Sequence, residues 1–128
     1  MKLIFQLAVL SLFLIGCHKP PTDVEIYQQV IGTWKNAPSA SDTVTILSEM
    51  RSDGSFFSKW LGATNDNEVD GIWKVQDGFM VMTMTNVPST IARSLGSMVQ
   101  RYKIVQIDNE KFVSHLEGDT NLFTMTRQ

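Results

Sequence analysis

The sequence has a single cysteine, Cys17, and so no second thiol with which to form an intrachain disulfide. It also lacks a block of basic residues, because its 11 lysines and arginines are spread along 128 residues and are outnumbered by 13 acidic ones. Nucleic-acid binding needs clustered positive charge against the phosphates, so this class of function is excluded. A chain of this length forms one domain of ordinary size, which must be held together by its hydrophobic core.

Motifs of catalysis and of metal or phosphate binding are missing as well. No Gly-x-Ser-x-Gly sequence is present, and the glycines are scattered at turns instead of forming a phosphate-binding loop. The segment from Asp66 to Asp77 begins like a calcium loop, but strands are expected around it where such a loop needs helices. His18 and His115 lack the partners that a metal site or an acid–base pair requires. We therefore expect no enzyme activity, no catalytic residue, no metal and no cofactor.

The first sixteen residues are hydrophobic but too short for a permanent membrane span. Lys2 precedes an apolar stretch from Leu3 to Ile15, which as a helix would be about 20 Å long against the roughly 30 Å of a bilayer's hydrocarbon core. One positive charge followed by an apolar run is typical of a signal peptide, which is removed from the mature protein. The sequence therefore predicts a signal peptide at residues 1–16.

Residues 14–17, Leu-Ile-Gly-Cys, resemble the lipobox of bacterial lipoproteins. The resemblance implies that Cys17 is acylated on its sulfur, becomes the first mature residue and holds the protein to a membrane through acyl chains such as palmitate. Residues 17–21 would then be a lipidated tether. Its two prolines favour an extended polyproline conformation. In Gram-negative lipoproteins an aspartate after the cysteine marks inner-membrane retention. His18 stands there instead, so the resemblance implies the outer membrane of the cell envelope.

The mature chain is predicted to start with one helix and to continue as strands. Thr22 and Glu25 match a capping box, which predicts a helix from about 23 to 30. From Gly32 onward the pattern changes to apolar alternation with a period of two, broken by compact polar turns. We expect about eight strands, at 32–36, 43–50, 55–61, 68–76, 79–85, 98–107, 111–117 and 121–127. Short turns between consecutive strands favour an antiparallel up-and-down meander.

The strand expected at 79–85 is apolar on both faces. Phe79 begins one face, while Met80, Met82 and Met84 make up the other. One interpretation is that the outer face is covered by the N-terminal helix or by a partner. The other is that the methionines form a flexible ligand-binding surface, because thioether side chains adapt to varied apolar shapes.

The connection at 86–97 is the one long link between expected strands. Within it, Ser89 would cap a helical turn that carries Ile91 and Leu95 and ends at Gly96. Such a segment either forms a lid over a barrel mouth or simply covers the end of the sheet.

Gly32-Thr33-Trp34 after a short helix, the meander that follows, and Arg127 in the last strand together resemble lipocalins. In that family the Gly-x-Trp segment and an arginine of the final strand close the barrel floor, with the guanidinium packed over the indole. The resemblance assigns this barrel-floor pair to Trp34 and Arg127. Asp-Gly-x-Phe and Gly-x-Trp…Asp-Gly hairpins also resemble the compact lipocalin-like domains of bacterial lipoproteins. The resemblance covers most of residues 22–128 and implies a small all-β barrel or half-barrel.

The expected function is non-catalytic binding of a small apolar ligand by a lipid-anchored envelope protein. An eight-stranded barrel is just wide enough to be filled by its own side chains or to hold one small ligand. The candidates for the ligand-binding wall are Trp60, Trp73, Phe79 and Met82. The alternative is an interaction or structural module with a filled core, in which the methionines of the 79–85 strand form the surface of a homodimer.

Overall fold

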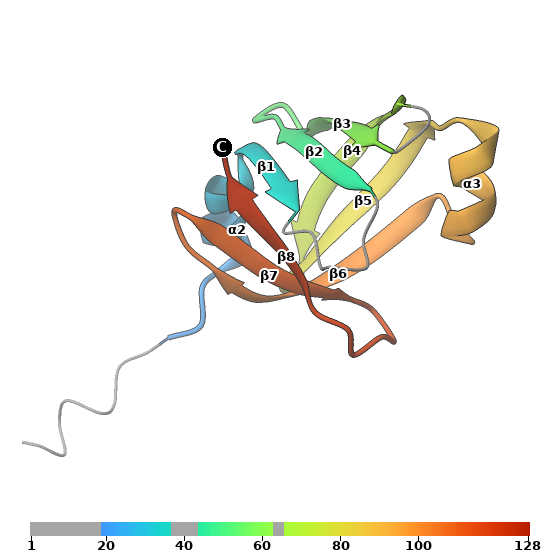
Figure 1. Ribbon diagram of the computed structural model, residues 1–128. Coiled ribbons are helices and arrows are strands. Elements are labelled where there is room, and N and C mark those ends of the chain that lie inside the picture. Colours follow the sequence, from blue (N-terminus) through green and yellow to red (C-terminus); the bar gives the residue numbers. More distant parts are fainter. Residues whose placement is uncertain (1–18, 37–43, 63–65) are drawn as a thin grey trace, which may run out of the picture.

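The protein folds as a closed eight-stranded antiparallel β-barrel with two short helices in the part of the chain that its computed structural model describes, residues 19–36, 44–62 and 66–128 (Figure 1). The elements are α2 (Asp23–Val30), β1 (Gly32–Asn36), β2 (Thr45–Met50), β3 (Ser55–Leu61), β4 (Asp66–Gln76), β5 (Phe79–Asn86), α3 (Ser89–Leu95), β6 (Val99–Ile107), β7 (Lys111–Leu116) and β8 (Phe123–Arg127). The strands follow one another around the barrel in chain order, and β1 pairs with β8. The predicted all-β meander is confirmed, and the sheet closes completely.

The two ends of the barrel differ in the segments that cover them. Because the strands run up and down in sequence order, the β2–β3, β4–β5 and β6–β7 turns all lie at the end where β1 starts. Helix α2 immediately precedes β1 and lies at this same end, while α3 lies at the opposite one (Figure 1). We call the α2 end the floor and the opposite end, where the β7–β8 loop at 117–122 lies, the mouth.

Helix α2 begins and ends where the sequence predicts. Thr22 and Glu25 form both hydrogen bonds of the capping box, at 2.9 and 3.2 Å, which satisfies backbone donors that the first turn leaves free. Ile26 and Val30, one turn apart, are buried in the core of the barrel. The helix therefore presents its apolar side to the floor.

Two side chains of α2 attach the helix to the turns around it. The carboxylate of Asp23 accepts hydrogen bonds from the backbone N–H groups of Asp77 and Gly78, both at 2.8 Å. The Tyr27 hydroxyl donates to the Ser52 carbonyl oxygen at 3.0 Å, and its ring stacks on Trp73 with centroids 4.2 Å apart. These contacts join α2 to the β4–β5 and β2–β3 turns and so close the floor.

Helix α3 exists but is not capped as predicted. Its N-cap is Pro88, and no side-chain hydrogen bond caps it, so the expectation that Ser89 caps the turn was wrong. Gly96 ends the helix with a φ of 70°, a conformation that glycine adopts without the steric cost of a β-carbon. Ile91 is buried in the main core, and the Gln100 side chain donates to the Leu95 carbonyl oxygen at 3.2 Å. The helix is thus packed onto the end of the sheet.

Candidate ligand-binding cavity

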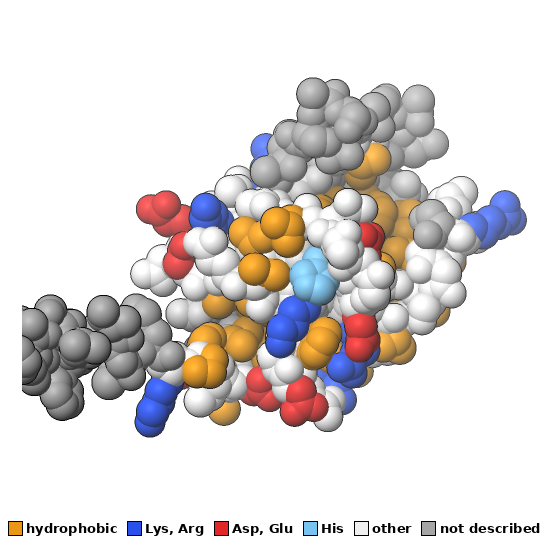
Figure 2. All heavy atoms as spheres, turned by 90° about the horizontal axis from the view of Figure 1, so that it is seen from below, with side chains coloured by type: hydrophobic (Ala, Val, Ile, Leu, Met, Phe, Trp, Pro, Cys, Tyr) orange, Lys and Arg blue, Asp and Glu red, His pale blue; other side chains and the backbone are white. Residues whose placement is uncertain are grey.

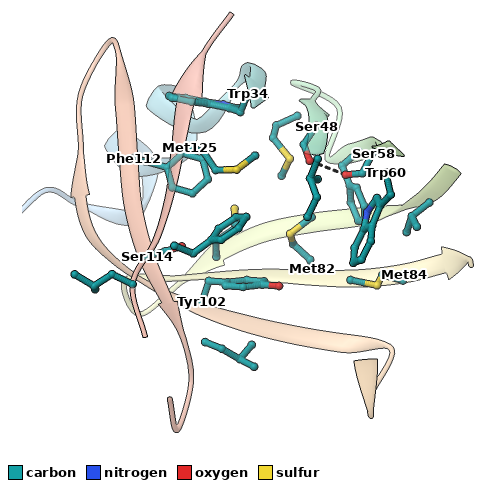
Figure 3. A pocket seen from close by; sticks show the side chains of 18 of the residues that line it. Trp34, Ser48, Ser58, Trp60, Met82, Met84, Tyr102, Phe112, Ser114 and Met125 are labelled. Carbon is teal, nitrogen blue, oxygen red and sulfur yellow. Dashed lines mark hydrogen bonds between the residues drawn. The ribbon is translucent and has the colours of Figure 1, made fainter. Parts of the chain in front are cut away.

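The barrel encloses a cavity of about 320 Å³ between the floor and the mouth (Figure 3). All eight strands contribute to its lining, which is mostly apolar. Asp119, Asn121 and Leu122 of the β7–β8 loop line it as well and are themselves exposed, so the cavity is open to solvent at the mouth. The interior is therefore not filled by the protein's own side chains, and a small molecule can enter it.

Trp34 and Arg127, which the lipocalin resemblance pairs, are in contact at the floor. They are cross-strand partners in the β1–β8 ladder, and the guanidinium lies 4.2 Å from the centroid of the fully buried indole. The indole N–H donates to the Val30 carbonyl oxygen at 2.7 Å. This geometry is that of a cation–π contact whose ring is also fixed to the end of α2.

The guanidinium of Arg127 also satisfies three backbone carbonyls. It donates to the carbonyl oxygens of Gln29 at 2.7 Å, Ile31 at 2.9 Å and Asn109 at 2.7 Å. The first two belong to the C-terminal end of α2, where free carbonyls and the helix dipole both favour a positive charge. One side chain therefore joins the last strand, the helix and the β6–β7 turn.

The glycine of the Gly-x-Trp segment is required by this arrangement. Gly32 has a φ of 139°, which residues with a side chain rarely adopt, and a β-carbon there would collide with the guanidinium of Arg127. The three-residue pattern thus has a steric explanation: Gly32 leaves the space that Arg127 occupies over Trp34.

Methionines make up a large share of the cavity wall. Met80, Met82 and Met84 of β5 all point into the barrel, where Met50 and Met125 join them. The proposed outer stripe of methionines, and with it a homodimer surface made of those three residues, was wrong, because they form the inner face of β5. Of the two interpretations of this strand, the structure places the methionines where a flexible ligand-binding surface would need them.

Two of the four predicted wall residues line the cavity. Trp60 of β3 and Met82 of β5 are in its lining and face it (Figure 3). Trp73 does not line the cavity, although its side chain points inward, because it lies near the end of β4 at the floor. There its ring stacks on Tyr27, and the indole N–H donates to the carbonyl oxygens of Arg51 and Ser55, both at 3.1 Å. The prediction for Trp73 was therefore wrong.

Phe79 does not line the cavity either, because it lies on the outer face of the barrel. Arg101 and Lys103 of the neighbouring strand β6 place their charged groups 4.7 and 5.0 Å from its ring centroid. Long basic side chains commonly cover apolar surface in this way while their charges remain in water. Among the described residues, the side chains of Arg101 and Lys103 therefore lie over the Phe79 ring on this outer face.

Hydrophobic side chains on the outside are distributed in small groups. On the face seen from below the view of Figure 1, they are separated by charged and other polar side chains (Figure 2). Single apolar side chains of this kind are common on the surfaces of globular domains.

Polar groups in the cavity fall into two kinds. The hydroxyls of Ser48 and Ser58 are buried and hydrogen bonded to each other at 2.7 Å (Figure 3). The Oγ of Ser114 is also buried but has no hydrogen-bond partner among the described residues. The Tyr102 hydroxyl makes no hydrogen bond to a described residue, and burial alone raises the pKa of this group. The sequence reasoning missed all four residues, although alternation places Ser114 on the inner face of β7 between Phe112 and Leu116.

Charge at the mouth is negative. Asp119 is the one charged side chain among the described residues that line the cavity. A hydrogen bond from the backbone N–H of Asn121, at 3.0 Å, is the largest cause that lowers the pKa of Asp119. The carboxylate is therefore ionised at neutral pH.

Helix α3 carries none of the described residues that line the cavity. Of the two roles that the sequence left open for this segment, the structure supports a cover for the end of the sheet, because Ile91 is fixed in the core.

The described residues contain no group of three or more His, Cys, Asp and Glu side chains that could hold a metal ion.

Cys17, His18 and the predicted signal peptide lie outside the described residues. Among the helices that the structure does describe, none has the length and apolar character to cross a membrane.

The fold and the site together define a small closed β-barrel with an apolar cavity that is open at one end. Comparison with known proteins found no matching family model and no matching curated protein.

Proposed function

We propose that this protein is a lipid-anchored lipoprotein of the bacterial cell envelope that binds a small apolar ligand inside its barrel and does not catalyse a reaction. The observation that carries the proposal is the mostly apolar cavity of about 320 Å³, open at the mouth and closed at the floor. Its volume lies at the lower end of the usual range for ligand pockets, about 300–1,000 Å³. The alternative of a filled core loses support, because this core is not filled.

The size of the cavity limits the ligand. A water molecule takes about 30 Å³ of the liquid, so the cavity has room for on the order of ten non-hydrogen atoms. Five methionines in the lining can adjust their shape around such a molecule, since each has three rotatable bonds and a polarisable sulfur. We therefore expect compact hydrocarbons to bind, and the methionines to tolerate several shapes.

Isothermal titration calorimetry with n-butylbenzene tests this proposal. The soluble chain from residue 18 onward is suitable, because every contact of the fold described above lies between residues 22 and 128. We expect saturable binding, and a Trp60→Ala variant should bind about tenfold more weakly because it loses an aromatic wall.

The matched control is Ile72→Ala, which removes an apolar side chain from the outer face of β4, where it is 57% exposed. This variant should bind n-butylbenzene as the unaltered chain does. Absence of saturable binding in the unaltered chain, or an equal effect of both substitutions, would contradict binding in the barrel.

A further inference from the structure

The described part of the cavity lining contains no positive charge that could neutralise an acidic ligand. Among the described residues that line the cavity there is no lysine, arginine or histidine, and Asp119 at the mouth is negative. An ionised carboxylate moved into an apolar site without a cationic partner loses its hydration and gains little in return. A ligand whose acid group stayed at the mouth would instead face the Asp119 carboxylate. Free fatty acids and similar anions are thus poorly suited to this cavity.

The same cavity does contain hydroxyl groups without partners. Tyr102 of β6 and Ser114 of β7 lie on neighbouring strands and line the cavity from one side (Figure 3). We call these two residues the β6–β7 wall. Neither hydroxyl is hydrogen bonded to a described residue, in contrast to the Ser48–Ser58 pair.

The buried Oγ of Ser114 has no partner, which is unfavourable, so a ligand that supplies the missing hydrogen bond gains affinity relative to one that does not. A ligand that covers the half-buried Tyr102 hydroxyl must likewise offer it a hydrogen bond in place of water. The phenol of Tyr102 remains protonated at neutral pH, because burial disfavours its charged form and raises its pKa. It can therefore donate to an oxygen of a ligand. A ligand that fills the cavity also displaces water, whose hydrogen bonds it must replace.

We propose that the cavity selects an uncharged molecule with a compact apolar body and one hydroxyl or carbonyl oxygen, which pairs with Tyr102 on the β6–β7 wall, where Ser114 is the second hydrogen-bonding group. This inference rests on the proposed ligand-binding function and specifies its ligand class. It separates alcohols, ketones and esters from hydrocarbons on one side and from carboxylates on the other.

The test compares three probes with the same phenylbutyl body: n-butylbenzene, 4-phenyl-1-butanol and 4-phenylbutanoate. Calorimetry at neutral pH on the soluble chain from residue 18 onward should show that the alcohol binds most tightly and the carboxylate at least about tenfold more weakly than the alcohol. In Tyr102→Phe, which removes only the hydroxyl, affinity for the alcohol should fall about three- to tenfold, the usual range for one hydrogen bond. Affinity for n-butylbenzene should stay the same.

Two further variants make the result specific. Ser114→Ala removes the orphan hydroxyl, so it should leave the unliganded chain as stable as before or more stable, and yet weaken binding of the alcohol. The matched control, Tyr27→Phe, removes a tyrosine hydroxyl at the floor that is not part of the cavity lining, and it should preserve the preference for the alcohol.

The outcomes separate the two proposals. If n-butylbenzene binds but the carboxylate binds as tightly as the alcohol, the selection of uncharged ligands is overturned while ligand binding stands. If Tyr102→Phe and Ser114→Ala leave the preference for the alcohol unchanged, the assignment to the β6–β7 wall is overturned. If none of the three probes binds, both the ligand class and the proposed function fail.

Discussion

Arg127 stabilises the floor of the barrel because its guanidinium meets several groups at once. It lies over the Trp34 ring and donates to the carbonyl oxygens of Gln29, Ile31 and Asn109. These carbonyls lie at the end of a helix and in a turn, where no strand supplies a partner. The space for this side chain depends on Gly32, which lacks a β-carbon.

Replacement of Gly32 by alanine should therefore be costly in two ways. It introduces strain at a φ of 139° and pushes a methyl group into the Arg127 guanidinium, so we expect the free energy of unfolding to fall by about 2–4 kcal/mol. Denaturant titration of the purified domain measures this change. Gly118→Ala is the control, since Gly118 also has a positive φ of 85° but nothing within 4 Å, and it should cost only about 1 kcal/mol.

A double variant distinguishes the collision from the strain. In an Arg127→Ala background the methyl group of Gly32→Ala no longer meets a guanidinium, so the second substitution should cost clearly less than it does alone. Additive effects of the two substitutions would show that the close approach of Gly32 and Arg127 contributes nothing to stability.

Among the elements, helix α2 is the one that closes the floor of the barrel. Asp23 in its first turn binds the β4–β5 turn, Tyr27 binds the β2–β3 turn, and Val30 at its end accepts a hydrogen bond from Trp34. An eight-residue helix is too short to be stable alone in water, so it depends on these tertiary contacts.

The contact of Asp23 with the β4–β5 turn can be tested by Asp23→Asn. The amide keeps one acceptor oxygen where the carboxylate offers two, so one of the two hydrogen bonds to Asp77 and Gly78 should be lost, at a cost of about 1–2 kcal/mol. Amide hydrogen exchange measured by NMR should become faster at these two residues. Glu25→Gln is the control, because Glu25 belongs to the capping box of the same helix and does not contact the turn; equal acceleration in both variants would contradict the role of Asp23.

In the molecule as a whole, one end of the barrel is closed by packed side chains and the other end opens the cavity to solvent. The floor contains the aromatic rings, the arginine and the helix that give the fold its stability. The mouth contains the exposed β7–β8 loop and the opening of the cavity. Helix α2 begins at Asp23, a few residues after Cys17, so a lipid on that cysteine would tether the chain from the side of the helix that closes the floor.

The proposed anchor predicts a defined labelling pattern. The full chain expressed in a Gram-negative host should incorporate labelled palmitate and separate with the outer membrane, and Cys17→Ser should do neither, because it lacks the thiol that is acylated. His18→Asp is the matched variant: it keeps the cysteine, so labelling should persist while the protein moves to the inner membrane. Palmitate incorporation by Cys17→Ser would contradict the assignment.

Local patterns in the chain were enough to predict the elements of the fold and their order. The capping box of Thr22 and Glu25 fixed the start of α2, and the alternation of apolar residues gave eight strands whose ends agree with the structure to within two residues. Both signals depend on neighbours in the chain, which is why they can be recognised without tertiary information. The pairing of Trp34 with Arg127 came from a resemblance and is realised as a contact at the floor.

Which residues line the cavity could not be predicted from these local patterns, because it depends on how the barrel closes. Strand β5 is apolar on both faces, so its pattern could not tell that Met82 points inward and Phe79 outward. Trp73 shares the inner face of β4 with Val69, yet Val69 lines the cavity and Trp73 packs at the floor. A period of two specifies two faces of a strand, but closure of the barrel fixes which face is inside and how far along the axis each side chain lies.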